Sequence, residues 1–382
     1  MVSVEKPRPP TILRVLVGGD LLPHRPLLID PPRIGQALAP LAQLFGGANM
    51  VVANYETSTG DPRLVGDKPM TLVVSEAWMA ELKRAKIGAL TIANNHACDL
   101  GEAGLDATLA TANELGLTAI GADAQDHDPW KARVLAEADG HRVCAVAWTT
   151  FLNGGSGACG DDTKIALAAS KKRDPARIAR AITRAKQEQH CDVVIAIIHG
   201  GKEYAPQIIL PRKQARVAAE AGADAVVVHH PHVPAPVHVI TTKDGRSVPV
   251  FLSVGNLVSN QGESWKIPYF PVRADRHHVS MNAWTRLGMI ADLAFTWDAT
   301  SGTPATAATL AWGYHLVWTD NEHAIHHDDP APRIAVRLVD RAADRELTTL
   351  LGRDKEGPRE LFSSRCWLDG ASARCNSRDN SP

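Results

Sequence analysis

The chain has 382 residues, of which 45% are hydrophobic and 22% are charged, and this composition is typical of a globular protein with a sizeable core. Its 41 basic and 42 acidic side chains give a net charge of −1, which disfavours a nucleic-acid-binding protein because that class normally carries a basic surplus. No apolar run approaches the roughly 20 residues of a membrane span, and the first run, residues 11–17, is too short for a secretory signal. We therefore expect a soluble, cytoplasmic protein with neither a nucleic-acid nor a membrane partner. Nothing in the sequence predicts an oligomeric state.

Strand-like apolar runs alternate with helical segments through the first third of the chain. The alternation predicts strands that run parallel within one sheet. Gly116 ends the third helix, because glycine readily adopts the left-handed conformation that follows a helix C-terminus. The expected strands are residues 12–19, 50–56, 87–95 and 117–122, and the expected helices are residues 33–45, 76–86 and 102–116.

Antiparallel pairs enter the pattern after residue 122. Two segments read as hairpins, and each contains an Asp-Gly pair that is a strong signal for a tight turn, Asp139-Gly140 and Asp244-Gly245. The mixture predicts an α/β sandwich of two mixed sheets flanked by helices, in preference to one doubly wound sheet. The expected elements are hairpins at 132–150 and 234–256, helices at 174–190 and 211–223, and strands at 191–201 and 224–233.

We expect a single domain over residues 1–340, followed by a C-terminal helix and tail over residues 341–382. Within the domain, residues 260–285 are polar, aromatic and irregular. Loops of this length inside compact domains usually carry function, so this segment is expected to be a substrate loop or lid.

Six cysteines are scattered along the chain without any CxxC pair. We expect them to be free thiols in a reducing compartment. A disulfide between Cys366 and Cys375 in the tail is the alternative. The cysteines are Cys98, Cys144, Cys159, Cys191, Cys366 and Cys375.

Polar side chains gather at the carboxyl end of one expected strand after another. In α/β proteins, ligand sites form at this edge of the sheet, where the loops converge. Five such groups can therefore line one cavity. They are Asp20 with His24, Asn54 with Glu56, Asn94 and Asn95 with His96 and Asp99, His199 with Glu203, and His229 with His230 and His232.

This collection of side chains favours a metal site. Histidine, carboxylate and amide ligands without thiolates suit Mn²⁺, Fe²⁺, Zn²⁺, Mg²⁺ or Ca²⁺ better than a sulfur-bound structural zinc. His230 and His232 are two residues apart, which places both rings on one side of an extended segment. No organic cofactor is required by any motif.

Six motifs resemble a known family in both order and spacing. The chain is similar to the CapA type of poly-γ-glutamate capsule protein, which belongs to the calcineurin-like metallophosphoesterase superfamily. The resemblance covers about residues 12–295 and implies a four-layer α/β sandwich with two mixed sheets. The motifs are GGDLLPH (18–24), NYE (54–56), ANNHACDLGEAGLDAT (93–108), HGGKEY (199–204), HHPHV (229–233) and SVGNLV (253–258).

The resemblance implies roles for particular residues. His96 corresponds to the acid/base histidine of the Asn-His signature, with Asp99 as its close partner. The metal-centre positions implied by the motifs are Asp20, Glu56, Asn95, His199, His230 and His232.

The chain also departs from the phosphoesterase pattern. Leu22 stands where the family's Asp-x-His motif has histidine, and His24 lies two residues further on. The Asn54/Glu56 pair replaces the bridging aspartate, and alanine follows His96. These departures count against a complete two-metal phosphatase centre and leave open a centre with one ion.

Three functions compete for this site. The fold favours metal-dependent hydrolysis of a phosphoester or amide, and the resemblance also implies a role in poly-γ-glutamate biosynthesis. The third reading is proton transfer at carbon, because one branch of CapA-like proteins is similar to enzymes that epimerise the C-terminal residue of ribosomally made lasso peptides. We favour a metal-dependent epimerase whose partner is a precursor peptide.

Inverting a Cα centre needs a base on one face and an acid on the other. Histidines oriented by carboxylates meet this need, and Ca²⁺ held partly through water is the favoured electrostatic anchor. The candidate pairs are His96 with Asp99, and one of His24, His199 or His230 with Asp20.

The irregular segment supplies the expected contacts to the peptide. Aromatic side chains offer flat apolar area, and basic side chains could pair with a C-terminal carboxylate. The aromatic candidates are Trp265, Tyr269 and Trp284, and the basic candidates are Lys266, Arg273 and Arg276.

Overall fold

The structure is a computed structural model of the chain. It describes residues 9–24, 28–65, 71–155, 157–160, 164–169, 172, 174–204, 209–261, 283–298, 307–321 and 333–339. The helices are α1 (Pro31–Leu38), α2 (Ala42–Gly46), α3 (Glu76–Arg84), α4 (Gly101–Glu114), α5 (Asp174–Gln187) and α6 (Ile209–Glu220), with 3₁₀ turns η1 (Ala39–Leu41), η2 (Pro62–Val65) and η5 (Ala283–Arg286).

The first sheet contains the early strands of the chain together with the last ones. Its order is β16-β15-β14-β1-β2-β5-β6, and β13 also pairs with β1. The β1–β2–β5–β6 half is parallel, whereas β14 to β16 run antiparallel. Its strands are β1 (Thr11–Leu21), β2 (Met50–Tyr55), β5 (Ala89–Thr91), β6 (Thr118–Ile120), β13 (Asn256–Val258), β14 (Leu287–Trp297), β15 (Thr309–Asp320) and β16 (Ala335–Leu338).

The second sheet is formed by the middle of the chain, in the order β11-β12-β10-β9-β8-β7. Its central strands β8, β9 and β10 are parallel, and an antiparallel strand lies at each edge. The strands are β7 (Arg133–Ala138), β8 (His141–Thr149), β9 (Val193–His199), β10 (Ala225–His229), β11 (Val237–Thr241) and β12 (Ser247–Phe251), and a separate small pair is β3 (Ser58–Thr59) with β4 (Val73–Val74).

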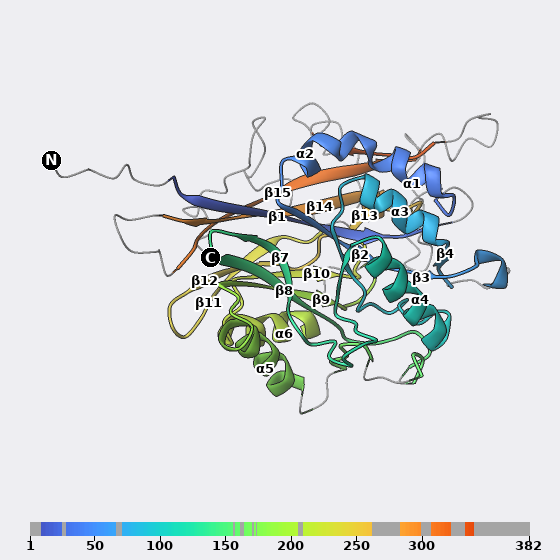
Figure 1. Ribbon diagram of the computed structural model, residues 1–382. Coiled ribbons are helices and arrows are strands. Elements are labelled where there is room, and N and C mark those ends of the chain that lie inside the picture. The colour runs from blue at the N-terminus through green and yellow to red at the C-terminus, as the bar shows by residue number, and fades with distance from the viewer. Residues whose placement is uncertain are drawn as a thin grey trace.

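Three apolar layers separate four layers of secondary structure. Val15 and Val17 of β1 meet Ile195 of β9 between the two sheets. The neighbouring Leu16 faces the other way and packs with Trp78 of α3, because successive strand side chains alternate between faces. A third layer joins the second sheet to α5 and α6. Figure 1 shows α1 to α3 on one side of the molecule and α5 with α6 on the other.

This architecture confirms the predicted four-layer sandwich with two mixed sheets. Both predicted hairpins are present, with Gly140 and Gly245 at positive φ in their turns. Gly116 follows α4 at φ 62°, as the helix-ending glycine requires. The predicted strand 87–95 is shorter, since β5 covers Ala89–Thr91 and the following residues turn into the polar cluster.

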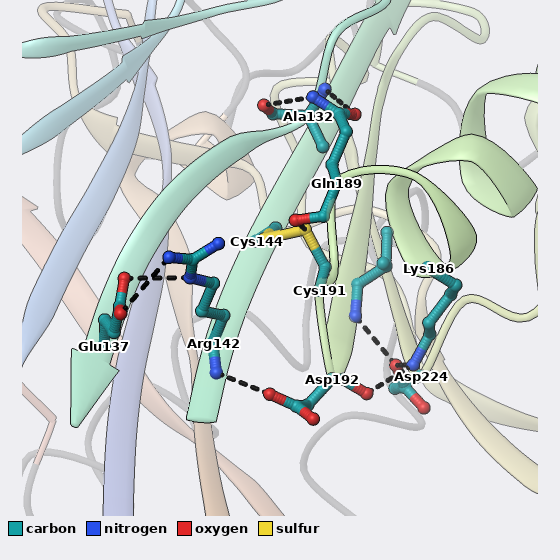
Figure 2. Close-up of a disulfide and its surroundings, with 10 residues drawn as sticks. Ala132, Glu137, Arg142, Cys144, Lys186, Gln189, Cys191, Asp192 and Asp224 are labelled. Carbon is teal, nitrogen blue, oxygen red and sulfur yellow. Dashed lines mark hydrogen bonds and ion pairs between the residues drawn. A yellow bond between two sulfur atoms is a disulfide. The ribbon is translucent and has the colours of Figure 1, made fainter. Parts of the chain in front are cut away.

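The described cysteines are paired, which corrects the expectation of free thiols. Disulfides join Cys98 to Cys159 and Cys144 to Cys191, with Cα atoms 5.1 and 5.8 Å apart, and no described cysteine is free. Figure 2 shows the second disulfide. It joins Cys144 of β8 to Cys191, which lies two residues before the start of the neighbouring strand β9. The cytoplasmic location stays a prediction, and the disulfides count against it because they persist mainly in oxidising compartments.

Several predictions fall on residues outside the described ranges. These include the tail cysteines Cys366 and Cys375, the C-terminal helix and tail, and most of the expected substrate loop, residues 262–282. None of the described helices is long and apolar enough to cross a membrane.

Candidate metal centre

The carboxyl ends of strands from both sheets converge on one buried cluster. Asp20 of β1 is in register with Asn54 of β2 and with Asn256 of β13. In the second sheet, His199 at the end of β9 is in register with His229 at the end of β10. The chain therefore brings together all five polar groups that the strand-end pattern predicted.

Asp20 reaches this position through a close contact between strands. A Cβ atom at the preceding Gly19 would collide with the carbonyl group of Gly255, so glycine is needed there for β13 to approach β1. The amide of Asp20 donates to the same carbonyl at 3.1 Å. Its carboxylate accepts the backbone N–H of His230 at 3.2 Å and lies 3.2 Å from Nδ1 of His232.

Glu56 faces the histidines of the second sheet. Its Oε1 lies 3.7 Å from Nε2 of His199 and 3.8 Å from Nε2 of His232. The ring of His230 lies close to both histidines, with ring centroids 4.9 Å from His199 and 5.5 Å from His232. All four residues are at most 3% exposed.

His230 and His232 have backbone conformations that non-glycine residues rarely adopt. Their φ angles are 96° and 60°, and Tyr204 nearby has a φ of 55°. Such conformations cost roughly 1–3 kcal/mol each and concentrate at functional sites. The HHPH segment is therefore held in a shape that local preferences oppose.

Asn54 makes hydrogen-bonding contacts with residues of both sheets in the cluster, although it was not among the predicted metal ligands. Its Nδ2 donates to Asp20 at 2.8 Å and lies 3.2 Å from Nδ1 of His199. Its Oδ1 accepts from Thr91 at 2.9 Å and from Asn94 at 3.2 Å. Asn54 thus fixes the first sheet's carboxylate and the second sheet's histidine relative to each other.

Burial and charge set the protonation of the cluster. Burial would raise the pKa of Asp20, but the hydrogen bond and charge of His232 outweigh it and hold that pKa below its usual range. Burial, reinforced by Asp20, raises the pKa of Glu56 well above its usual value. Burial and the charge of His230 hold the pKa of His199 well below its usual value, and burial with the charge of His232 lowers the pKa of His230 to about 3.

The residues fit a divalent cation. Among the described residues, three wholly buried atoms of the cluster, Glu56 Oε1, His229 Nδ1 and His230 Nδ1, have no hydrogen-bond partner, which is costly unless a ligand satisfies them. Neutral imidazoles are the form that binds metal. Three overlapping groups have ligand atoms within 4.8 Å of one another, namely Glu56–His199–His230, Glu203–His230–His232 and Asp20–Glu56–His232.

Asn95, which was predicted as a ligand, and Glu203, which was not, contribute differently from the rest. The Oδ1 atom of Asn95 lies 2.7 Å from Nε2 of His199, so it contacts the centre through that ring. Glu203 joins one group from the loop after β9 and is only half-buried. It stood in the HGGKEY motif but was not predicted as a ligand.

His96 and Asp99 form a separate pair beside the cluster. Nδ1 of His96 lies 2.7 Å from Oδ2 of Asp99, and both side chains are 5% exposed. The backbone N–H of Leu72 donates to the same Asp99 oxygen at 2.6 Å. Neither residue belongs to the three groups that could hold a metal among the described residues. The carboxylate therefore orients the ring and leaves Nε2 available.

His24 lies close to both parts of the site. Its Nδ1 accepts the backbone N–H of Asn260 at 3.2 Å. Burial, followed by the charges of His232 and His96, lowers its pKa to about 3. Leu22, which stands in place of the family's histidine, is 2% exposed.

Trp284 was predicted to contact substrate, but its side chain is 1% exposed and belongs to the apolar layer between the sheets. In this structure its indole offers no surface on which a peptide could rest. The other predicted substrate contacts, Trp265, Lys266, Tyr269, Arg273 and Arg276, lie outside the described residues.

Comparison with known proteins decides the family. The family described as bacterial capsule synthesis protein PGA_cap matches residues 14–261. The chain belongs to this family. The CapA-like resemblance, within the calcineurin-like metallophosphoesterase superfamily, is thereby confirmed, and the matched range includes every described residue of the metal cluster.

Two curated relatives of this PGA_cap chain carry similar names. The chain is 30% identical over 222 residues to the PGA biosynthesis protein CapA of Bacillus subtilis (strain 168), which is 57% of this chain and 55% of that protein. It is 32% identical over 200 residues to the capsule biosynthesis protein CapA of Bacillus anthracis, covering 51% and 46%. The chain spans about half the length of the curated relatives it matches.

Proposed function

We propose that this chain is a metal-dependent peptide epimerase that inverts the Cα of the C-terminal residue of a ribosomally made lasso precursor peptide. One observation carries the proposal: the His96–Asp99 pair lies next to a buried cation-binding cluster but outside its ligand groups. A hydrolase needs metal ligands arranged around a bound water molecule or phosphate group. The resemblance implies an acid/base histidine at this position in the phosphoesterases as well, so an epimerase differs in needing a second proton carrier on the opposite face of the carbon.

The chain's own residues supply two proton carriers. His96 gives its Nδ1–H to Asp99, so Nε2 holds the lone pair that accepts a proton. We assign His24 as the second carrier because it is buried close enough to the site for the charges of His232 and His96 to add to the effect of burial on its pKa. The two rings start each turnover in opposite protonation states: the Cα–H bond breaks toward the neutral imidazole, and the ring that starts as imidazolium returns a proton to the opposite face. The two rings exchange protonation states in each turnover.

A divalent cation, when bound, supplies positive charge that stabilises the negative charge developing on the carbonyl oxygen next to the reacting carbon. The residues that would hold it are Glu56, His199 and His230, with His232 and Asp20 on the adjoining side. Imidazole ligands suit Mn²⁺, Fe²⁺ or Zn²⁺, whereas Ca²⁺ prefers oxygen alone. We therefore expect a transition ion in preference to the calcium that the motifs alone favoured.

The second candidate is metal-dependent hydrolysis, or another step in capsule polymer biosynthesis. The printed names of the relatives favour it, and the three overlapping ligand groups would serve a hydrolytic centre as well. Leu22 counts against the phosphoesterase form, because an apolar, buried side chain stands at a ligand position of that family.

One experiment separates the candidates. We expect the purified chain, loaded with Mn²⁺, to incorporate one deuterium at the terminal Cα of some members of a synthetic decapeptide library that varies the C-terminal residue, when incubated in D₂O. A chelator should abolish the exchange. Release of nitrophenol from p-nitrophenyl phosphate, with no deuterium in any peptide, would instead favour the hydrolase.

A further inference from the structure

The loop after β8 lies against the turn that carries His96. The backbone N–H of Asn153 donates to the carbonyl of Asn95 at 3.0 Å, and the side chain of Asn95 donates back to Oδ1 of Asn153 at 3.2 Å. These reciprocal hydrogen bonds join a segment of the second sheet to the segment that follows β5 in the first sheet. No sequence motif included Asn153.

The side-chain amide of Asn153 also contacts the proposed proton carrier. Its Nδ2 lies 3.3 Å from Nδ1 and 3.4 Å from Nε2 of His96, so the amide contacts the ring at almost the same distance from both nitrogens. Nδ1 already pairs with Asp99 at 2.7 Å. An atom almost equidistant from both nitrogens cannot lie on the lone-pair axis of either one, so the amide packs against the ring and limits its rotation while Nε2 stays available.

The same loop contacts the metal cluster. The backbone N–H of Thr150 donates to the carbonyl of His199 at 2.9 Å. The ring of Phe151 packs edge-on against that of His230, with centroids 4.9 Å apart. Three of the first four residues after β8, Thr150, Phe151 and Asn153, thus contact a metal-centre residue, a ligand ring and the acid/base pair.

A disulfide fixes this loop to the His96 turn. Cys98 lies two residues after His96, and its partner Cys159 lies six residues after Asn153 and is 0% exposed. A cross-link of this kind reduces the freedom of the segments that it joins. Asn153 is half-buried, so its position beside the ring depends on the hydrogen bonds with Asn95 and on the disulfide more than on apolar packing.

We propose that Asn153 is a positioning residue for His96, and that the Cys98–Cys159 disulfide keeps Asn153 in that position. The inference rests on the proposed function only for its kinetic consequence. The geometric part concerns the orientation of the His96 ring and holds for any reaction at this site.

The test compares variants of the full, oxidised chain. Asn153→Asp retains the oxygen that accepts from Asn95 and replaces the nitrogen that faces His96, whereas Asn153→Ala removes both contacts. Asn113→Asp, at an exposed position on α4, is the matched control. For the disulfide, Cys159→Ser is compared with Cys191→Ser, which breaks the disulfide at the other end of the second sheet.

Two readouts keep this inference distinct from the proposed function. We expect Asn153→Asp and Asn153→Ala to lower kcat for deuterium exchange on the order of 10²-fold, the usual cost of misplacing a catalytic group. KM and Mn²⁺ affinity should change by less than about threefold, since neither ground-state contacts nor ligands are removed. In spectra of the chain labelled with ¹⁵N-histidine, the His96 ring signals should shift in both variants and in Cys159→Ser.

Each outcome tests either the positioning role of Asn153 or the role of the Cys98–Cys159 disulfide. An unshifted His96 signal in Asn153→Asp overturns the positioning role, even if the wild-type chain exchanges no deuterium and the proposed function has failed. A Cys159→Ser spectrum identical to that of Cys191→Ser overturns the role of the disulfide. Equal losses of kcat in Asn153→Asp and Asn113→Asp would also contradict the proposal.

Discussion

The metal cluster and the His96 corner, which consists of His96, Asp99 and Asn153, are neighbours, yet they differ in whether their polar atoms find partners within the chain. In the cluster, wholly buried carboxylate and imidazole atoms come from both sheets, and Glu56 Oε1 and His230 Nδ1 lack a hydrogen-bond partner among the described residues. In the corner, His96 is already paired with Asp99 and flanked by Asn153. The first arrangement is incomplete without a cation. The second is complete within the chain and needs only a substrate proton.

The largest effect should come from breaking the corner. His96→Ala removes the proposed proton carrier, so we expect a loss of roughly 10²–10⁴ in the rate of deuterium exchange, the range for one acid/base group. Mn²⁺ binding, measured by calorimetry, should be unchanged because His96 is outside the ligand groups. His238→Ala, at an exposed position on β11, is the control. Near-normal exchange by His96→Ala would remove this residue from the mechanism.

A substitution in the metal cluster should have the opposite effects, a lower Mn²⁺ affinity and an unchanged environment of the His96 ring. Glu56→Gln keeps the shape of the side chain but removes the charge, and we expect Mn²⁺ affinity to fall. Loss of a residue that only hydrogen-bonds to a metal ligand costs roughly 10–100-fold in affinity, and loss of a ligand should cost at least as much. The matched control is the exposed Glu188→Gln. The ¹⁵N signals of the His96 ring should stay in place. Unchanged Mn²⁺ affinity in Glu56→Gln would mean that the cluster is not the metal site.

The pH dependence of stability sharpens the contrast. Burial lowers the pKa of both His24 and His230 to about 3, against an ordinary value of 6.5. Between these two pH values the unfolded chain binds more protons than the folded chain. Stability therefore falls as pH decreases from 6.5, with a slope of up to about 1.4 kcal/mol per pH unit for each histidine.

Urea denaturation of the metal-free chain, measured from pH 7 to pH 4, tests this slope. We expect His230→Gln to lose less stability over this range than the wild-type chain, because one of the buried groups that must stay neutral is gone. His238→Gln should follow the wild type. The raised pKa of Glu56 contributes a slope of the opposite sign, so the comparison with the variant decides: a His230→Gln profile identical to that of the wild type would contradict the lowered pKa of His230.

The smallest effect on the site should come from the disulfide at the far end of the second sheet. Cys144 and Cys191 lie among the contacts of Arg142 with Asp192 and of Lys186 with Asp224, as Figure 2 shows. Cys191→Ser should lower the free energy of unfolding by about 2–4 kcal/mol. Deuterium exchange and Mn²⁺ affinity should stay within about twofold of the wild type, and a larger change would mean that the two ends of the sheet are coupled.

The sequence predicted the parts of the site that follow from strand direction. Asp20, Glu56 and His199 each end a strand, and parallel strands place their carboxyl ends at one edge. Asn153 was missed because no strand end or motif marks it, and its role arises from the packing of one loop on another. The pairing of Cys98 with Cys159 was missed for the same reason, since spacing along the chain does not reveal which cysteines meet.

Trp284 illustrates the opposite error. An aromatic residue next to a long irregular segment suggests an exposed contact, but the chain turns through η5 and inserts this side chain between the sheets. Whether a side chain enters the core at such a junction depends on the space that distant strands leave, and sequence pattern does not report that space.

The division between a cation-binding cluster and a metal-free proton carrier is tested most directly by diffraction from crystals soaked in Mn²⁺, with an anomalous difference map. The account predicts a manganese peak bonded to Glu56, His199 and His230, with both nitrogens of His96 outside bonding distance. A peak bonded to His96, or no peak within the cluster, would contradict it.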